Sequence, residues 1–286
     1  MRTVGRVVTK QRLGPDAQVD DKAIIIAPTS FAATDPFLAL SEDWFSSPGF
    51  DWHPHRGLET VTIVLDGVLE HGDSLGHAGA LEPGDVQWMT AGRGIIHREL
   101  AYRNEHAHTL QLWVNLPADR KLVATRYQDL RRDGLTVHSG PGVTARVVSG
   151  ESGGVAGPAL THHPVTGLLL TLDPATEHTQ PLPADERAFA YVIAGEVEVA
   201  GRPVTAGQVA WSDPVGRTGT STLALRTPDG DERTQVMLFA GRPLGEPVVL
   251  GGPFVMNSRA EIEQAFRDFR SGRFGDVPRL ARLRTR

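Results

Sequence analysis

Two histidines separated by one residue, His53 and His55, are the first side chains whose spacing could support chemistry. The run that follows, residues 60–65 (TVTIVL), has the alternation and β-branched content of a strand. Side chains two residues apart on a strand point to the same face, so the two imidazoles are expected to project together. A lone His-x-His also arises by chance or as a buried hydrogen-bonded pair. A second group of potential ligands is therefore needed before the pattern indicates a metal site.

That second element is another pair two residues apart, His97 and Glu99, which follows one hairpin later. Gly92 and Gly94 precede the pair and allow a tight turn that re-aims the strand. If the two strands face each other, three imidazoles and one carboxylate converge. Such a set suits a divalent transition metal better than magnesium or calcium. The sequence therefore predicts one metal site, made by His53, His55, His97 and Glu99.

The composition is that of a globular protein and excludes several classes of site. A net charge of −5 gives no global basic field that would attract nucleic acid. The absence of cysteine excludes disulfides, thiolate zinc sites, iron–sulfur clusters and cysteine nucleophiles. No signal sequence follows Met1 and no apolar run is long enough to span a bilayer, so we expect a cytoplasmic protein without membrane association.

Apolar residues near the predicted ligands have two interpretations, a substrate cleft or a packed core. Core packing is favoured for each of Trp52, Trp88, Met89 and Trp113. The run 109–116 (TLQLWVNL) reads as a strand on which Gln111 shares a face with Trp113. Either face of this strand could look into a barrel.

Strand signals recur in two blocks, which predicts two β-domains, residues 1–138 and residues 139–286. Hairpin signals at Asp66-Gly67 and Ala194-Gly195 stand at similar places in the two blocks and form a weak internal repeat. The second block carries Asp185-Glu186-Arg187-Ala188 where the first carries its histidines. We therefore expect the metal in residues 1–138 only.

A short C-terminal helix is predicted after Ser258, which forms a capping box with Glu261. Apolar residues follow at helical spacing and Gly272 ends the helix. The remaining tail is rich in arginine, and a solvated or chain-docking tail is favoured over nucleic-acid contact. These arginines are Arg273, Arg279, Arg282, Arg284 and Arg286.

Two strand-rich blocks with a His-x-His loop suggest an all-β protein of two cupin-type jelly-roll β-barrels with a short C-terminal helix. Four long motifs also resemble the pirin family, in the same order and over nearly the whole chain. They are FDWHPHRGLETV, GDVQWMTAGRGIIHRE, QLWVNLP and GEPVVLGGPFVMNSRAEIEQAFRDFRSGRFG.

The resemblance implies a bicupin whose N-terminal barrel holds one metal ion, usually iron. By position, its ligands match His53, His55, His97 and Glu99. Glu59 stands where many other cupins supply a glutamate ligand, and a packing role is favoured for it here. We expect Fe(II), with nickel, manganese, copper, cobalt or zinc as the alternatives.

Three functions are compatible with that resemblance. The first is a metal-dependent quercetin 2,3-dioxygenase, in which Glu99 acts as the catalytic base toward the 3-hydroxyl of a flavonol, and ring cleavage by O2 releases carbon monoxide. The second is an iron-binding, redox-sensing protein that binds a protein partner without turnover. The third is another cupin reaction on a different small molecule.

Overall fold

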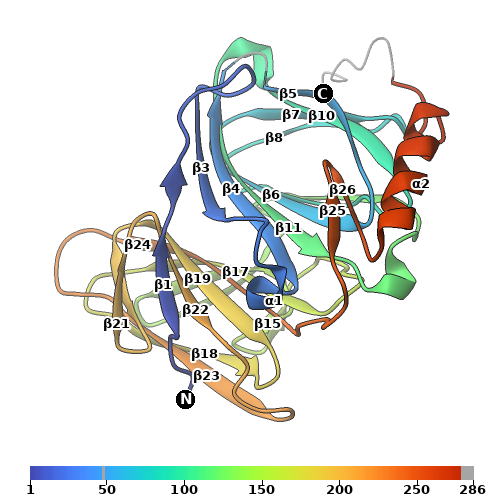
Figure 1. Cartoon of the computed structure of the whole chain (residues 1–286). Helices are drawn as coiled ribbons and strands as arrows, with labels where there is room; N and C mark the ends of the chain where they lie inside the picture. The colour runs from blue at the N-terminus through green and yellow to red at the C-terminus, as the bar shows by residue number, and fades with distance from the viewer. Residues whose placement is uncertain (47–48, 278–286) are drawn as a thin grey trace. The chain divides into compact units, whose positions relative to one another are not determined.

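The structure, a computed structural model, describes residues 1–46 and 49–277. It forms two compact units (Figure 1). The histidine unit, named for His53, His55 and His97, comprises Arg12–Arg132 and Leu244–Arg286, and the second unit comprises Met1–Gln11 and Asp133–Pro243. Four arginines of the predicted tail lie outside the described residues, namely Arg279, Arg282, Arg284 and Arg286.

Two antiparallel sheets build the histidine unit. The larger sheet has the order β12-β9-β6-β11-β4-β3-β2, and the smaller has the order β5-β10-β7-β8. The larger contains β2 (Gln11–Arg12), β3 (Asp21–Ile26), β4 (Phe37–Phe45), β6 (Leu58–Gly67), β9 (Val86–Thr90), β11 (Ala107–Asn115) and β12 (Arg126–Leu130). The smaller contains β5 (Phe50–His55), β7 (Leu69–Asp73), β8 (Ala78–Leu81) and β10 (Ile95–Ala101).

The second unit repeats this arrangement, with sheet orders β1-β22-β19-β24-β17-β14-β13 and β18-β23-β20-β21. The larger sheet contains β1 (Arg6–Thr9), β13 (Thr136–Gly140), β14 (Val143–Ser149), β17 (Val165–Leu172), β19 (Arg187–Ala194), β22 (Gln208–Ser212) and β24 (Thr234–Gly241). The smaller contains β18 (Glu177–Pro183), β20 (Glu196–Val199), β21 (Arg202–Thr205) and β23 (Thr220–Arg226). The internal repeat seen in the sequence is therefore a repeat of topology.

Alternating side chains explain why these segments form half-buried strands. In β20 the two valines, Val197 and Val199, are buried while Glu196 and Glu198 are exposed. The valines join an apolar cluster of the second unit that includes Leu168, Leu223 and Leu238 among its members. Burial of one face of each strand is the main source of stability for such a sheet.

The chain turns at Asp66-Gly67, as predicted, but the turn joins β6 of the larger sheet to β7 of the smaller sheet and does not close a hairpin. Gly67 has a φ of 71°, a left-handed conformation that glycine adopts without steric strain. A Cβ atom at this position would also clash with the backbone carbonyl of His106. Glycine is thus required here both by the backbone conformation and by the close approach of another loop.

Helix α2 (Arg259–Arg270) confirms the predicted C-terminal helix. The backbone N–H of Glu261 donates to Oγ of Ser258, as the capping box requires. The helix buries Ile262 and Ala265 against Phe254, which lies in the hairpin of β25 (Val249–Gly251) and β26 (Phe254–Met256). The described residues also include β15 (Glu151–Ser152), β16 (Val155–Ala156), α1 (Phe31–Thr34) and the 3-10 helices η1 (Tyr102–Asn104) and η2 (Ala118–Arg120).

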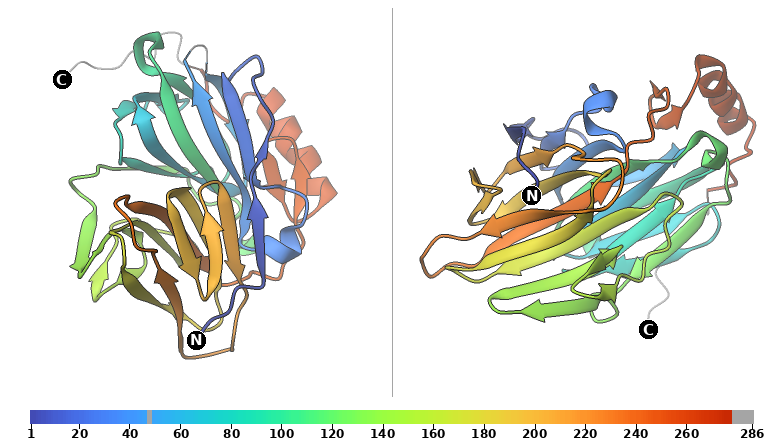
Figure 2. Two further views of the ribbon diagram at one scale, coloured as in Figure 1. Left: turned by 90° about the vertical axis from the view of Figure 1, so that its left-hand side faces the viewer. Right: turned by 90° about the horizontal axis from the view of Figure 1, so that it is seen from below.

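The two compact units differ from the expected consecutive division at residues 138 and 139. The chain passes from one unit to the other at Arg132–Asp133, close to the expected boundary. However, the N-terminal segment Met1–Gln11 belongs to the second unit, and the segment that begins at Leu244 belongs to the histidine unit. Strand β1 belongs to the second unit because it pairs with the free edge of β22 (Figure 2). Helix α2 belongs to the histidine unit because its apolar face is covered by Phe254 and Ile96. The unit to which each chain end belongs is therefore determined by strand pairing and apolar packing between residues far apart in the sequence.

The all-β prediction with a short C-terminal helix is confirmed by these elements. Within residues 1–46 and 49–277, no helix has the length and apolar character needed to cross a membrane.

Candidate metal centre

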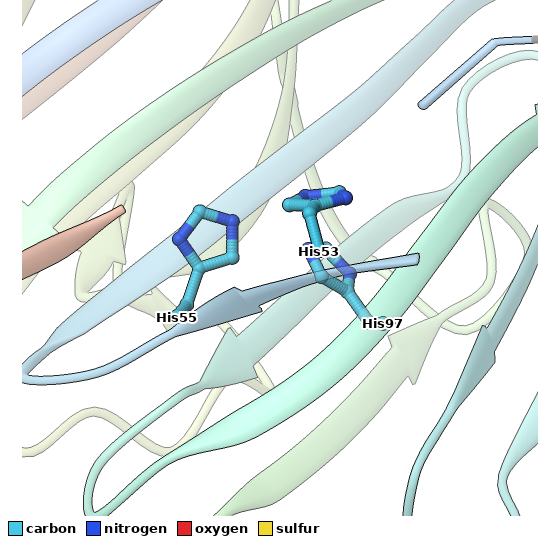
Figure 3. Close-up of side chains that lie close together, drawn as sticks. All are labelled: His53, His55 and His97. Atoms are coloured by element: carbon cyan, nitrogen blue, oxygen red, sulfur yellow. The ribbon is translucent and has the colours of Figure 1, made fainter. Parts of the chain in front are cut away.

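Strands β5 and β10 bring the three predicted histidines together. The two strands are antiparallel, and His97 is the direct partner of His53, while Ile95 is the partner of His55. The ring centroid of His97 lies 4.3 Å from that of His53 and 5.0 Å from that of His55. One potential ligand nitrogen from each ring lies within 4.8 Å of the others (Figure 3). The predicted convergence of three imidazoles is therefore present in the fold.

The hydrogen bonds around these rings leave nitrogens available for an ion. Nδ1 of His53 lies 2.7 Å from the carbonyl oxygen of Asp51, and Nδ1 of His55 lies 3.3 Å from that of Pro253. In each case the backbone oxygen fixes an Nδ1–H tautomer and frees Nε2, a common arrangement of metal-binding histidines. Nε2 of His55 and both nitrogens of His97 are buried without a hydrogen-bond partner among the described residues. A metal ion would satisfy such nitrogens.

Burial also keeps two of the rings in the form that binds metals. Desolvation, with a smaller contribution from His53, lowers the pKa of His55 to about 3. The same causes lower the pKa of His97 well below its usual value. Both imidazoles are therefore neutral at physiological pH, which is the protonation state a metal ligand requires.

Glu99 lies beside this cluster but is hydrogen-bonded away from it. A β-bulge between His97 and Glu99 shifts the register, so that Glu99 pairs with Phe50. Its Oε1 accepts from Oγ1 of Thr62 at 3.1 Å and its Oε2 accepts from Nε2 of Gln111 at 2.7 Å. Among the described residues, the group whose ligand atoms lie within 4.8 Å contains the three histidines without Glu99. A fourth-ligand role for Glu99 stays a prediction.

Glu59 is also buried, and it is hydrogen-bonded to a neighbouring strand. Its Oε1 accepts a hydrogen bond of 2.6 Å from Oγ1 of Thr90 on the neighbouring strand β9. The cluster formed by the three histidines does not contain it.

A cavity of about 350 Å³ opens onto two of the histidines, His53 and His55, within the same unit. His53, His55 and Glu99 line it together with Gln111 and Trp113 of β11. The face of β11 that carries Gln111 is thus the one that looks inward, a choice the alternation of the strand left open. Other lining residues are apolar or charged side chains of β3, β4 and β5, such as Ile24, Leu40, Phe50 and Lys22.

The tryptophans near the site divide between core and cavity. Trp88 and Met89 are fully buried core residues, as expected. Trp52 packs beside the cluster of Phe254 and Ile262. Trp113 lines the cavity, with its ring 5.1 Å from that of His55 in an edge-on contact.

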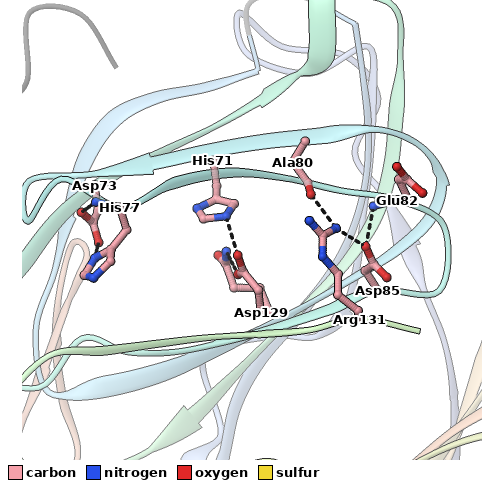
Figure 4. Close-up of polar contacts among 9 residues, drawn as sticks. His71, Asp73, His77, Ala80, Glu82, Asp85, Asp129 and Arg131 are labelled. Carbon is pink, nitrogen blue, oxygen red and sulfur yellow. Dashed lines mark hydrogen bonds and ion pairs between the residues drawn. The ribbon is translucent and has the colours of Figure 1, made fainter. Parts of the chain in front are cut away.

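A second polar layer lies on strands β7 and β12 (Figure 4). His71 on β7 is the strand partner of Glu99, and its Nε2 lies 3.2 Å from Oδ2 of Asp129. The other oxygen of Asp129 accepts from Nε2 of Gln87 at 2.9 Å, and the ring of Tyr127 stacks on His71. These contacts hold His71 in place on the strand next to that of Glu99. The sequence gives no sign of this layer because its members are distant along the chain.

The corresponding strands of the second unit carry other residues. In sheet order β18 and β23 occupy the places of β5 and β10. Their buried side chains include Leu182, Leu223 and Leu225, which join the apolar core of that unit. Asp185 and Glu186, aligned with the histidines in the sequence repeat, lie in the turn between β18 and β19.

Comparisons with known proteins agree with this architecture. A family model described as Pirin matches residues 23–114, and one described as Pirin C-terminal cupin domain matches residues 168–275. The chain is 42% identical to human Pirin over 243 residues, which cover 84% of this chain and 83% of that protein. It is 38% identical to a tomato (Solanum lycopersicum) pirin-like protein over 281 residues, 94% and 93% of the two chains. A solved structure, quercetin 2,3-dioxygenase from Acinetobacter baumannii, superposes with a TM-score of 0.85 at 30% identity, over 97% of this chain and 99% of that one.

Proposed function

The chain belongs to the pirin family of bicupin proteins, and from this membership we propose that it is a metal-dependent dioxygenase that cleaves a flavonol such as quercetin. The observation that carries the proposal is a cavity lined by His53 and His55, two of three imidazoles that converge. The similarity to a protein named quercetin 2,3-dioxygenase supports the choice of substrate class.

We assign the metal to His53, His55 and His97, with Glu99 as the fourth ligand, and Fe(II) as the ion. The unpartnered ring nitrogens of His55 and His97 support this assignment, because a buried imidazole nitrogen without a partner is unfavourable unless an ion binds it. When bound, the ion would supply the Lewis-acid and one-electron chemistry that dioxygenation needs. Three nitrogen ligands and one oxygen also suit nickel, manganese, copper, cobalt and zinc.

The walls of the cavity suit a flat aromatic substrate. Leu40, Phe50 and Trp113 provide apolar and aromatic surface. The ammonium group of Lys22 lies over the ring of Phe50 at 5.3 Å and 3.5 Å from Oδ1 of Asp43. Asp43 also lines the cavity and pairs with this ammonium group, so Lys22 would offer a hydrogen-bond donor to a flavonol oxygen rather than a net positive charge.

Glu99 is the residue to which we assign proton transfer. Its complete burial raises the pKa of the carboxyl above its usual value, so it accepts a proton more readily than an exposed glutamate does. The hydrogen bonds from Thr62 and Gln111 hold the carboxylate in one orientation. The proton of the flavonol 3-hydroxyl would pass to Glu99, and the ring then opens with one O2 consumed and one carbon monoxide released.

Oxygen uptake with quercetin tests this function. The protein is purified without chelators, its metal content is measured, and samples are reloaded with iron, nickel, manganese, copper, cobalt or zinc. Equimolar loss of quercetin and O2 with release of carbon monoxide is expected for at least one metal, and is expected to vanish in the His53→Ala His97→Ala variant. Absence of turnover with all six metals would contradict the proposal and favour a metal-sensing protein that binds a protein partner without turnover. Uptake of O2 with another aromatic substrate but not with quercetin would indicate a different cupin reaction.

A further inference from the structure

The second unit contains a cavity of its own, with a volume of about 680 Å³. It is lined by the β15–β16 hairpin, the start of β17 and the end of β18. Val165, Pro181 and Pro183 give it apolar walls, and the turn that follows β18 contributes Glu186. A cavity of this size accommodates a small molecule.

Glu186 lines this cavity, and no hydrogen bond to its carboxylate is found among the described residues. The residue is only 6% exposed, and its Oε2 atom is buried without a hydrogen-bond partner among the described residues. A buried carboxylate oxygen without a donor is unfavourable by more than the strength of an ordinary hydrogen bond. Burial and the nearby Asp185 raise the pKa of Glu186 to about 7.

The neighbouring polar groups are already engaged with one another. Oγ of Ser152 donates to Oε1 of Gln180 at 2.7 Å, and Nε2 of Gln180 donates to the carbonyl oxygens of Glu151 and Pro181. Ser152 and Gln180 therefore do not occupy the Glu186 carboxylate, which lines the cavity as an acceptor for a donor that enters it.

The nearby cations are engaged as well. The buried guanidinium of Arg2 donates to Oγ of Ser221 and to the backbone oxygens of Asp213, Pro183 and Glu186. Arg242 pairs through Nε with Oδ2 of Asp185 at 2.6 Å. The hydrogen bonds of Arg2 and the ion pair of Arg242 thus go to groups other than the Glu186 carboxylate. A ligand that brings its own positive charge and N–H donors therefore complements the site better than a neutral one.

We propose that this cavity is a second ligand site, which binds a small organic amine through a charge-assisted hydrogen bond from its ammonium group to Glu186. The apolar walls around Val165 and the two prolines receive the hydrocarbon part of the amine. The site is independent of the metal centre, because the cavity is formed entirely by residues of the second unit.

Calorimetric titration of the full-length protein with benzylamine and with benzyl alcohol tests the proposal. The two probes share an aromatic body and differ in charge, so benzylamine is expected to bind with 1:1 stoichiometry and the alcohol about tenfold more weakly or worse. Glu186→Gln, which keeps the shape and removes the charge, is expected to weaken benzylamine binding by about tenfold or more. Equal affinity of wild type and Glu186→Gln, or no saturable binding to the wild type, would overturn the assignment.

Two further variants establish where the amine binds. Thr161→Phe places a ring in the cavity without altering Glu186 and should also weaken benzylamine binding, with thermal unfolding used to confirm that the variant is folded. Because an amine can also coordinate a metal ion, the titration is repeated on the His53→Ala His97→Ala variant. Binding that persists there excludes the metal centre as the site of the amine, and binding that disappears there would refute a location in the second unit.

Discussion

Nη1 of Arg56 donates a hydrogen bond of 2.8 Å to Oδ2 of Asp268, and this largely buried ion pair ties the residue after His55 to helix α2. Arg56 also donates from Nε to the carbonyl oxygen of Arg93, and its guanidinium lies over the ring of Phe274 at 4.6 Å. The turn that follows His55, a predicted ligand, is therefore held by contacts to three separate segments. Helix α2 contributes to the site through this pair, although it supplies no predicted ligand.

Asp268→Asn is expected to loosen this turn. The substitution leaves the buried guanidinium of Arg56 without its carboxylate, and breaking such a pair destabilises the folded state by about 3 kcal/mol. We expect a lower urea midpoint together with weaker metal retention on dialysis. Glu263→Gln on the same helix is the matched control, because Glu263 faces Arg267 at 3.9 Å in an exposed pair that should contribute little. Equal behaviour of the two variants would contradict this role of Asp268.

The packing of α2 gives a second prediction, which concerns Phe254 and Phe266. Phe254 is fully buried and contacts the rings of Phe266, Phe269 and Phe274. Phe254→Ala is expected to lower the free energy of unfolding by about 3–5 kcal/mol, as for other fully buried phenylalanines. Phe266 is only partly buried, so Phe266→Ala should have a smaller effect. Chemical denaturation of both variants measures the two losses in free energy of unfolding. A larger loss for Phe266→Ala than for Phe254→Ala would show that the helix is docked differently.

Local patterns predict the histidine cluster because strand geometry is local. The spacing of His53 and His55 places both rings on one face whatever surrounds them. The pairing of β5 with β10 then needs only that the two strands lie side by side. The topological repeat was visible for the same reason, since turn signals recur at similar spacing in both blocks.

Contacts made across long sequence separations were not predictable from such patterns. The carbonyl of Pro253, which fixes the tautomer of His55, lies 198 residues away along the chain. Thr62 and Gln111, which orient Glu99, belong to strands whose inward faces the alternation alone cannot identify. The exchange of β1 and α2 between the units has the same origin, because it depends on which apolar face and which sheet edge remain free.

Metal stoichiometry provides a third prediction. We expect one metal ion per chain, lost entirely in the His53→Ala His55→Ala variant, because the corresponding strands of the second unit bury leucines. His163→Ala is the control, since Nε2 of His163 bonds the carbonyl oxygen of Arg242 in the second unit. Elemental analysis after gel filtration gives the measurement. A full equivalent of metal remaining in the double variant would place a site elsewhere in the chain.

The raised pKa of Glu186 predicts a pH-dependent stability. Because burial raises this pKa from 4.5 to about 7, the folded state holds a proton between these values that the unfolded state releases. This contribution to stability is fully present below pH 4.5 and is lost as the pH rises toward 7, with a total of about 3 kcal/mol. Glu186→Gln should flatten that part of the stability profile in urea titrations. Glu196→Gln, at an exposed position, should leave the profile unchanged. If the stability of Glu186→Gln depends on pH between 4.5 and 7 as steeply as that of the wild type, the raised pKa of Glu186 is contradicted.

The final prediction separates holding the metal from transferring a proton. His97 has no hydrogen-bond partner for either ring nitrogen among the described residues, and His97→Ala removes one of the predicted ligands. We expect this variant to lose metal and turnover together. Glu99 is held by Thr62 and Gln111 even without an ion, and Glu99→Gln keeps an oxygen at this position while removing the base.

Glu99→Gln should therefore retain much of the metal and lose most flavonol cleavage, by about 100-fold or more if general base catalysis operates. Metal content and oxygen consumption are measured on both variants, with Glu59→Gln as a buried control carboxylate outside the histidine cluster. Full turnover by metal-replete Glu99→Gln would remove the base role from Glu99. Loss of metal in Glu99→Gln to the level of His97→Ala would instead make Glu99 an essential ligand, since the amide would then have failed to replace the carboxylate at the ion.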